Sequence, residues 1–142
     1  MITTPSAVLA AIEALVRATM LNAKFTRGAA KPSSMAPGGH VVMNDGVAGD
    51  PEVTLSPTLY TYTHRVGLSV APFPGADPRA ALTIMLAPLA AAVVADPFLG
   101  GLADYMEFET PDTDETETLG ASGLNWADVG LLVTYTTANP LG

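Results

Sequence analysis

The sequence contains no cysteine, which excludes disulfide bonds, thiolate nucleophiles and cysteine-ligated metal sites. Basic residues are also scarce: 6 lysines and arginines stand against 14 acidic residues, for a formal net charge of −8. A chain with so few cations lacks the broad basic surface that binding to nucleic acids or anionic membranes requires. We therefore expect neither specific DNA binding nor a membrane partner.

Long hydrophobic runs are missing as well. The longest uncharged stretch lies within residues 80–95, and Pro88 interrupts it. It falls short of the ~18–20 residues that a membrane-spanning helix needs. The first residues lack the basic start and the small-residue cleavage site of a secretory signal. The sequence therefore predicts a soluble protein.

What is present is enough for one folded domain. The chain has 142 residues, of which 49% are hydrophobic and 14% charged. A chain of this length can bury a substantial core, and this composition is not that of a disordered protein. We predict a single domain over residues 1–142, with a mobile loop at about 22–39 and an acidic loop at about 107–125.

Apolar residues at helical spacing predict two helices. The first runs from Pro5 to about Leu21, with Thr4 as its cap. The second follows Asp77 and Pro78, and its apolar stripe consists of Leu82, Met85, Leu86, Leu89 and Val93. Pro88 predicts a kink or a break into two helices. Because the other faces of this second helix are also apolar, it should lie deep in the domain or meet another subunit.

Alternating residues and turn signals predict five strands. They are placed at His40–Asn44, Glu52–Ser56, Leu59–Ala71, near Ala103–Thr110 and at Ala127–Ala138, with Asn44-Asp45-Gly46 contributing to the first turn. In the third strand Tyr60, His64 and Val66 fall on the more apolar face. The predicted fold class is α+β, a single mostly antiparallel sheet with helices packed against it, in the order α-β-β-β-α-β-β.

No motif predicts catalytic, metal-binding or cofactor-binding residues. Asp112 and Asp114 begin like a calcium loop, but Glu117 stands where such a loop needs glycine. His64 fits a buried or interface position, and neither it nor His40 has a metal-ligand spacing. The acidic loop is then a solvated segment or a protein contact. We expect no cofactor and no enzymatic activity.

The charges are segregated along the chain. The first 43 residues carry a net charge of +3 and the remainder −11. Two oppositely charged segments on one domain suit head-to-tail association into rings or filaments, although two unrelated solvated loops remain an alternative. The candidate interface residues are Arg17, Lys24, Arg27 and Lys31 on the basic side, and Glu107, Glu109, Asp112, Asp114, Glu115 and Glu117 on the acidic side.

The order of elements resembles that of the tail terminator proteins of long-tailed phages and gene transfer agents. Three stretches add to the likeness: the Ala/Leu-rich first helix, ADPFLGGLADY at Ala95–Tyr105, and VTYTT at Val133–Thr137 followed by the tail NPLG. None of them is a catalytic signature. The resemblance covers essentially the whole chain.

The resemblance implies a structural virion protein, assembled in the bacterial cytoplasm. Such proteins form a hexameric ring at the head-proximal end of the tail tube, stop tube polymerisation and join the tail to the head. The implied partners are further copies of the chain, the tail tube protein on one side and a head-completion (stopper) protein on the other. DNA would pass through the lumen without specific binding, which an acidic lining favours by repelling phosphates. The alternatives are another neck or tail-tube ring protein of the same particle, a binding module outside any virion, or a small α+β enzyme.

Overall fold

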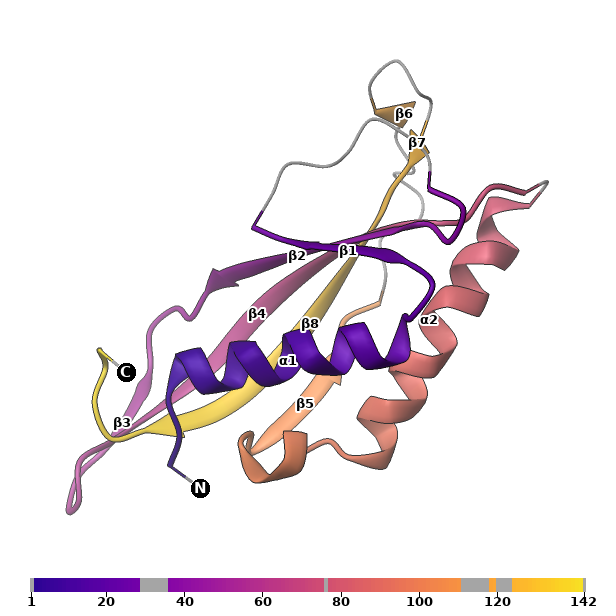
Figure 1. Cartoon of the computed structure of the whole chain (residues 1–142). Coiled ribbons are helices and arrows are strands. Elements are labelled where there is room, and N and C mark those ends of the chain that lie inside the picture. Colours follow the sequence, from indigo (N-terminus) through magenta and orange to yellow (C-terminus); the bar gives the residue numbers. More distant parts are fainter. Residues whose placement is uncertain (1, 29–35, 76, 111–117, 120–123, 142) are drawn as a thin grey trace.

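A single sheet carries two helices on one of its faces (Figure 1). The computed structural model describes residues 2–28, 36–75, 77–110, 118–119 and 124–141. The elements in chain order are α1 (Pro5–Thr19), β1 (Lys24–Arg27), β2 (His40–Val47), β3 (Glu52–Thr54), β4 (Leu59–Ala71), α2 (Pro78–Ala95), the short 3-10 helix η1 (Leu99–Gly101), β5 (Tyr105–Phe108), β6 (Thr118–Leu119), β7 (Leu124–Asn125) and β8 (Ala127–Thr137).

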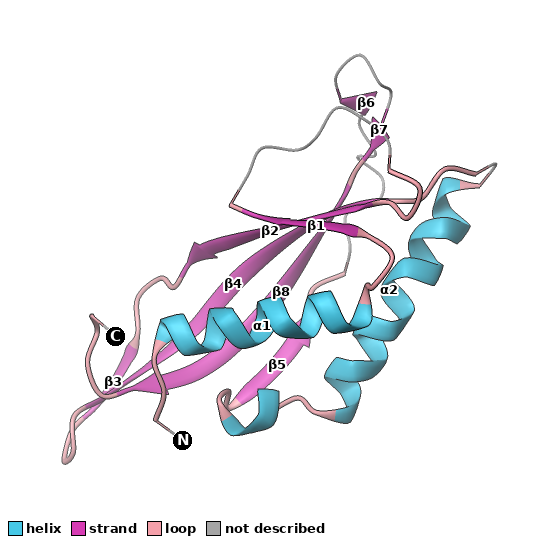
Figure 2. Cartoon of the chain, viewed as in Figure 1, coloured by secondary structure: helices cyan, strands magenta, loops and turns pink. Residues whose placement is uncertain are grey.

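The main sheet has six strands and is mixed but mostly antiparallel (Figure 2). Its order is β1-β2-β4-β8-β5, and β3 pairs with β4 beside this path. Among the described strand pairs of this sheet, the β1–β2 pair is parallel and the others are antiparallel. The longest ladder joins β4 to β8, so the two strands that begin at Leu59 and Ala127 form the centre of the fold. The predicted α+β class is confirmed, with one more strand before α2 than expected.

Helix α1 forms for the reasons that its sequence indicates. The Thr4 side chain accepts a hydrogen bond from the Ala7 N–H at 3.2 Å, and Pro5 occupies the first helical position, where no N–H is needed. The residues that α1 buries against the sheet are Val8, Ile12 and Val16, each at most 1% exposed. The amphipathic pattern therefore fixes which side of α1 faces the core.

Helix α2 is continuous from Pro78 to Ala95, so the predicted break at Pro88 does not occur. Its start is capped by the Asp77 carboxylate, which accepts hydrogen bonds from two main-chain N–H groups. Pro88 lies on the exposed side of the helix. Pro88 cannot bond the carbonyl of Ile84, and an internal proline costs less on a solvent-facing side of a helix, where water can satisfy the freed carbonyl. Within the described ranges, neither helix is long and apolar enough to cross a membrane.

Strand β1 lies inside the segment that was predicted to be a mobile loop, so that prediction is wrong for Lys24–Arg27. The four residues pair in parallel with the start of β2, and Phe25 packs against the hydrophobic core. The sequence does not reveal this strand, because two of its four residues, Lys24 and Arg27, are charged and four residues are too few to show a clear alternation of apolar and polar side chains. Of the remainder of the predicted loop, residues 29–35 lie outside the described residues.

The Asn44-Asp45-Gly46 sequence is a bulge within β2 and not the predicted turn. Asn44 pairs with Gly67, but the next registered pair is Val47 with Arg65, so the ladder is irregular between them. Gly46 has φ of 69°, and a Cβ atom there would meet the Arg65 carbonyl oxygen at 2.0 Å. A chain that both adopts this φ and passes so close to its neighbour requires glycine.

The helices cover one face of the sheet, and the other face is open except at one end, where Val42, Ala71 and Trp126 form a second, small buried cluster. On β4, Tyr62, His64 and Val66 belong to the covered face and are at most 7% exposed, as the alternation predicted. Thr63 and Arg65, on the open face, are exposed. This arrangement of one packed and one wetter face is typical of antiparallel sheets. The surfaces left for contact with other molecules are therefore the open face, the sheet edges and the outer sides of the helices.

Candidate interaction surfaces

Some cations of the predicted basic surface form ion pairs within the protein. The Arg27 guanidinium makes two hydrogen bonds to the Asp45 carboxylate, at 2.8 and 3.0 Å, and a third to Glu13 at 3.1 Å. Glu13 lies on α1 and Asp45 in the β2 bulge, so Arg27 ties both elements to β1. These bonds hold the pKa values of the Glu13 and Asp45 carboxyl groups below their ordinary range and raise the pKa of Arg27.

Arg17 is also engaged. It bonds the Glu13 carboxylate at 3.0 Å, and its guanidinium carbon lies 4.4 Å from the centre of the Phe25 ring. A cation over an aromatic face is attracted by the ring's negative face. Lys24 is the remaining described cation of this group; it is exposed, and no ion pair joins it to the described residues. Lys31 lies outside the described residues.

The acidic surface divides in the same way. Glu109 accepts a hydrogen bond from Arg65 at 2.5 Å, whereas Glu107 on β5 is exposed and has no ion pair among the described residues. The described part of the predicted acidic loop also includes the small β6–β7 ladder. The other four predicted residues, Asp112, Asp114, Glu115 and Glu117, lie outside the described residues.

The described members of the two sets that lie on or directly beside strands are at opposite edges of the main sheet. β1, which carries Lys24 and Arg27, is the first strand of the order, and β5, which carries Glu107, is the last. Glu109 follows β5 directly and continues its ladder, because its N–H donates to the Gly130 carbonyl at 2.8 Å. The basic residues of the first part of the chain therefore lie at one edge of the sheet, and the acidic residues of the later part lie at the other edge.

A second surface is the outer side of α2. The 16 residues from Ala80 to Ala95 include no charged side chain. The inner side buries the predicted stripe, with Leu89 and Val93 at most 4% exposed. On the outer side Ile84 is 63% and Val94 82% exposed, and the positions between them are alanine and proline. A helix face exposed over its whole length normally carries charged residues.

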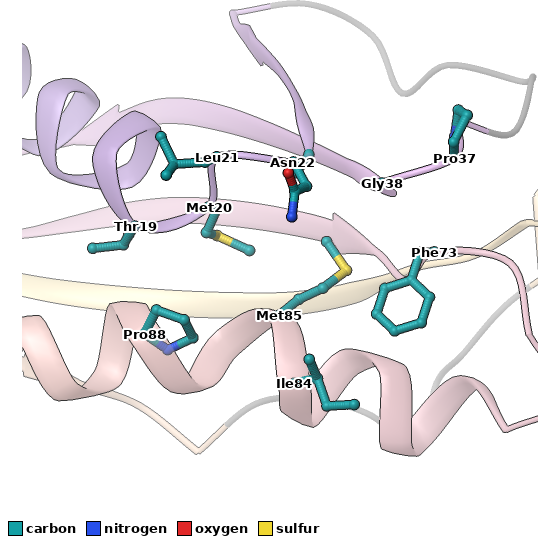
Figure 3. Close-up of a pocket in the computed structure, with 11 residues that line it drawn as sticks. Thr19, Met20, Leu21, Asn22, Pro37, Gly38, Phe73, Ile84, Met85 and Pro88 are labelled. Carbon is teal, nitrogen blue, oxygen red and sulfur yellow. The ribbon is translucent and has the colours of Figure 1, made fainter.

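A hollow of about 640 Å³ adjoins this face (Figure 3). It lies between the C-terminal end of α1 and the first half of α2, and Figure 3 shows Met85 and Phe73 at its inner side. Its lining includes no titratable side chain, and consists of Thr19, Met20, Leu21, Asn22, Ala23, Pro37, Gly38, Phe73, Ile84, Met85 and Pro88. Such a lining suits an apolar contact and offers no acid or base for catalysis.

The open face of the sheet has a smaller hollow of about 220 Å³. Gly67 and Gly130 lie directly opposite each other in the β4–β8 ladder, so neither strand contributes a Cβ atom at this point of the face. Arg65 and Glu109 form their ion pair above Gly130, where a Cβ atom would meet the Glu109 Oε1 atom at 2.5 Å. Alternation places both glycines on the open face, but only the strand register shows that they meet.

The two histidines lie apart from the larger hollow. His64 is 5% exposed and bonds Tyr135 in the core, which confirms the prediction of a buried residue. His40 is 2% exposed, and its ring is 5.9 Å from that of Trp126. Among the residues that the structure describes, no three histidines or acidic residues are grouped so that they could hold a metal ion.

No protein-family model matches the chain, and no curated protein matches it either.

Proposed function

We propose that the protein is a structural subunit of a phage-like tail, which forms a ring at the head-proximal end of the tail tube, stops tube polymerisation and joins the tail to the head. The observation that carries this proposal is the outer face of α2. A helix surface that is apolar, exposed and free of charge over the 16 residues from Ala80 to Ala95 is one that another protein covers. A subunit of a closed assembly uses such a surface to bind its neighbours. On a free monomer the same exposed apolar surface would promote aggregation.

The sheet edges support the same proposal. Opposite charges at the two edges favour contacts between different patches on neighbouring copies, and such head-to-tail contacts generate rings or filaments. In the proposed ring, which the resemblance implies to be a hexamer, each copy meets two others, and α2 is covered by an adjacent copy. The tail tube protein and the stopper protein would contact the two ends of the ring.

The overall charge suits passage of DNA. With a net charge of −8 the ring repels phosphates, so DNA moves through its lumen without being held. A role in another neck or tail-tube ring of the same particle is the second candidate, because the α2 face and the charged edges fit any ring of the stack. In either role the protein is a virion component that assembles in the bacterial cytoplasm.

The test is the length of tail tubes assembled with and without the protein. We expect the protein to bind tube ends and halt growth at a defined length. The Val94→Lys variant, which places a charge at the C-terminal end of the apolar face, should form fewer rings and leave tubes longer. Tubes of uncontrolled length in the presence of the unmodified protein would refute the proposal.

A matched control separates the α2 face from exposed valines in general. Val47, at the end of β2, is 80% exposed, against 82% for Val94. Val47→Lys therefore introduces the same charge at equal exposure outside α2, and it should assemble normally. Equal loss of assembly in both variants would remove α2 from the interface. Folding of both is checked by circular dichroism.

A further inference from the structure

We propose that neighbouring copies join by antiparallel pairing of β5 of one copy with β1 of the next, so that the main sheet continues from subunit to subunit. This inference rests on the proposed function in one respect, namely that the chain assembles with itself. It specifies the strands, their direction and the residues that meet.

Each edge strand is paired on one side only. Within the described ranges β1 pairs with β2 alone and β5 with β8 alone. A strand in this position presents a row of N–H and C=O groups that can template another strand. Both edges are short, at four residues each, so a pairing between them matches in length.

The direction of the two strands is suitable. β1 is parallel to β2, and the three remaining neighbours in the order are antiparallel to each other. It follows that β1 and β5 run in opposite directions. Repeating the subunit edge to edge therefore places β5 of one copy antiparallel to β1 of the next, which is the type of pairing that predominates within this sheet.

The main-chain groups of β1 that face outward can be identified. The Lys24 N–H donates to the Gly39 carbonyl at 2.9 Å, so Lys24 bonds toward β2. Alternate residues of a strand bond to the same side. The N–H and C=O groups of Phe25 and Arg27 therefore point away from β2, toward the free edge.

The main-chain groups of β5 alternate in the same way. The Glu109 N–H donates to the Gly130 carbonyl at 2.8 Å, so the residues in phase with Glu109 bond toward β8. Consequently the main-chain groups of Met106 and Phe108 point to the free edge. The side chain of Met106 lies on the covered face, at 1% exposure, and that of Phe108 packs on the same core.

The two edges are therefore in phase. In both strands the residues whose main-chain groups point outward have side chains on the helix-covered face, since Phe25 also packs on the core. Pairing Phe25 of one copy with Met106 of the other keeps the helices of both copies on one side of the joined sheet. A shift by one residue would instead turn every side chain of one edge to the wrong face.

This register brings the two free charges together. With Phe25 opposite Met106, Lys24 stands directly opposite Glu107, and both side chains are exposed on the open face. They form a pair without main-chain hydrogen bonds, in which side chains approach most closely. Arg27 and Glu109 already have intramolecular partners, so Lys24 and Glu107 are the described edge charges left for a neighbour.

The absence of cysteine permits a direct test by disulfide cross-linking. Lys24→Cys and Glu107→Cys proteins are mixed and oxidised at the highest concentration they reach, with and without tail tubes. The pairing predicts 24–107 heterodimers in excess of a random mixture. A Thr63→Cys protein, which carries an exposed position of the open face on the central strand β4, replaces Glu107→Cys in the control mixture and should give no excess.

The double variant Lys24→Cys/Glu107→Cys gives a second readout. The order of the sheet separates β1 and β5 by four strand spacings, which at about 4.8 Å each amount to about 19 Å. A disulfide bridges Cα atoms less than about 7 Å apart. Every disulfide in this variant is therefore intermolecular, and oxidation should produce a ladder of linked copies. A random distribution of cross-links, or 24–24 dimers alone, would overturn the proposal.

Charge reversal completes the test in the full-length protein. Lys24→Glu and Glu107→Lys should each reduce self-association at low salt, and the double reversal should restore it. A double variant that self-associates as weakly as the single variants would contradict the pairing.

The pairing and the proposed tail function can fail separately. If the strands cross-link as expected but tubes grow without control, the proposed tail function fails and the pairing stands. If tubes terminate normally in both single reversals, the pairing fails and the tail function stands.

Discussion

The Nδ1 atom of His64 lies 2.9 Å from the hydroxyl oxygen of Tyr135, in the core between β4 and β8. The other ring nitrogen, Nε2, lies 2.5 Å from the Asp45 carbonyl oxygen. A carbonyl oxygen only accepts hydrogen bonds, so Nε2 carries the proton. In the neutral ring Nδ1 then accepts from the Tyr135 hydroxyl group. This histidine therefore links the central ladder to the β2 bulge.

Removal of the Tyr135 hydroxyl should destabilise the fold. In Tyr135→Phe the buried Nδ1 atom of His64 loses its donor, and we expect a loss of about 1–2 kcal/mol in the free energy of unfolding. Tyr62→Phe is the matched control, because this ring packs 5.7 Å from that of Tyr135 and the described residues give its hydroxyl no hydrogen bond. Urea unfolding measures both. Equal losses would show that the bond to His64 contributes nothing.

Stability should also decline in alkaline solution because of Tyr135. Burial raises the pKa of this phenol above its ordinary value of 10.0. Above about pH 10 the unfolded chain releases a proton that the folded protein retains, so the free energy of unfolding falls as pH rises. The decline should be smaller in Tyr135→Phe and unchanged in Tyr105→Phe, at a half-exposed position. Urea unfolding at a series of alkaline pH values tests this, and an identical decline in both variants would contradict it.

Acid stability should depend on Arg27. Its hydrogen bonds lower the pKa of Glu13 below 4.5 and that of Asp45 below 3.8, with Arg17 adding to the effect on Glu13. The stabilisation from these carboxylates is present above their unfolded pKa values and is lost as pH falls through the lowered ones. Arg27→Met should therefore be less stable at neutral pH and lose less stability on acidification.

The control for this prediction is Lys24→Met, which removes one positive charge from the same strand without breaking an ion pair to the described residues. It should retain the acid dependence of the unmodified protein. Unfolding in urea is followed between about pH 6 and pH 3. If Arg27→Met and the unmodified protein show the same slope against pH, the network does not control acid stability.

The bulge in β2 should depend on glycine at position 46. Gly46→Ala combines a positive φ of 69° with contact to the Arg65 carbonyl oxygen, and we expect it to cost more than about 2 kcal/mol. Gly49→Ala has a similar φ of 73° with nothing within 4 Å, and it should cost about 1 kcal/mol. Thermal unfolding compares the two. Equal costs would show that the close approach to β4 is relieved easily.

Much of the fold was predictable because local patterns and tertiary packing agree. The bounds predicted for β4, Leu59–Ala71, coincide with the observed ones, since alternation of apolar and polar residues over 13 residues is typical of a strand. The caps Thr4 and Asp77 mark the starts of both helices. By contrast, β1 has four residues and gains its stability from pairing with β2, which no local pattern reports.

The candidate surfaces were predicted less completely. Composition indicated that α2 buries one face and leaves an apolar one for the interior or for another subunit, and the structure shows that face exposed. The cations Arg17 and Arg27 were predicted to dock on a neighbour, yet both bind Glu13 within the same chain. Sequence distance conceals the Arg27 pair, because 14 residues separate Glu13 from Arg27, whereas Arg17 lies only four residues from Glu13 on the same helix.

The sequence by itself determined the class of the fold, the faces of its strands and helices, and the segregation of its charges. These properties depend on the order of apolar, polar and charged residues along the chain, which local geometry converts directly into faces. The tertiary structure decided which charges pair and which strands lie at the edges. Those outcomes depend on strand order and register, which place residues far apart in sequence side by side, and they left Lys24 and Glu107 at opposite edges of one sheet.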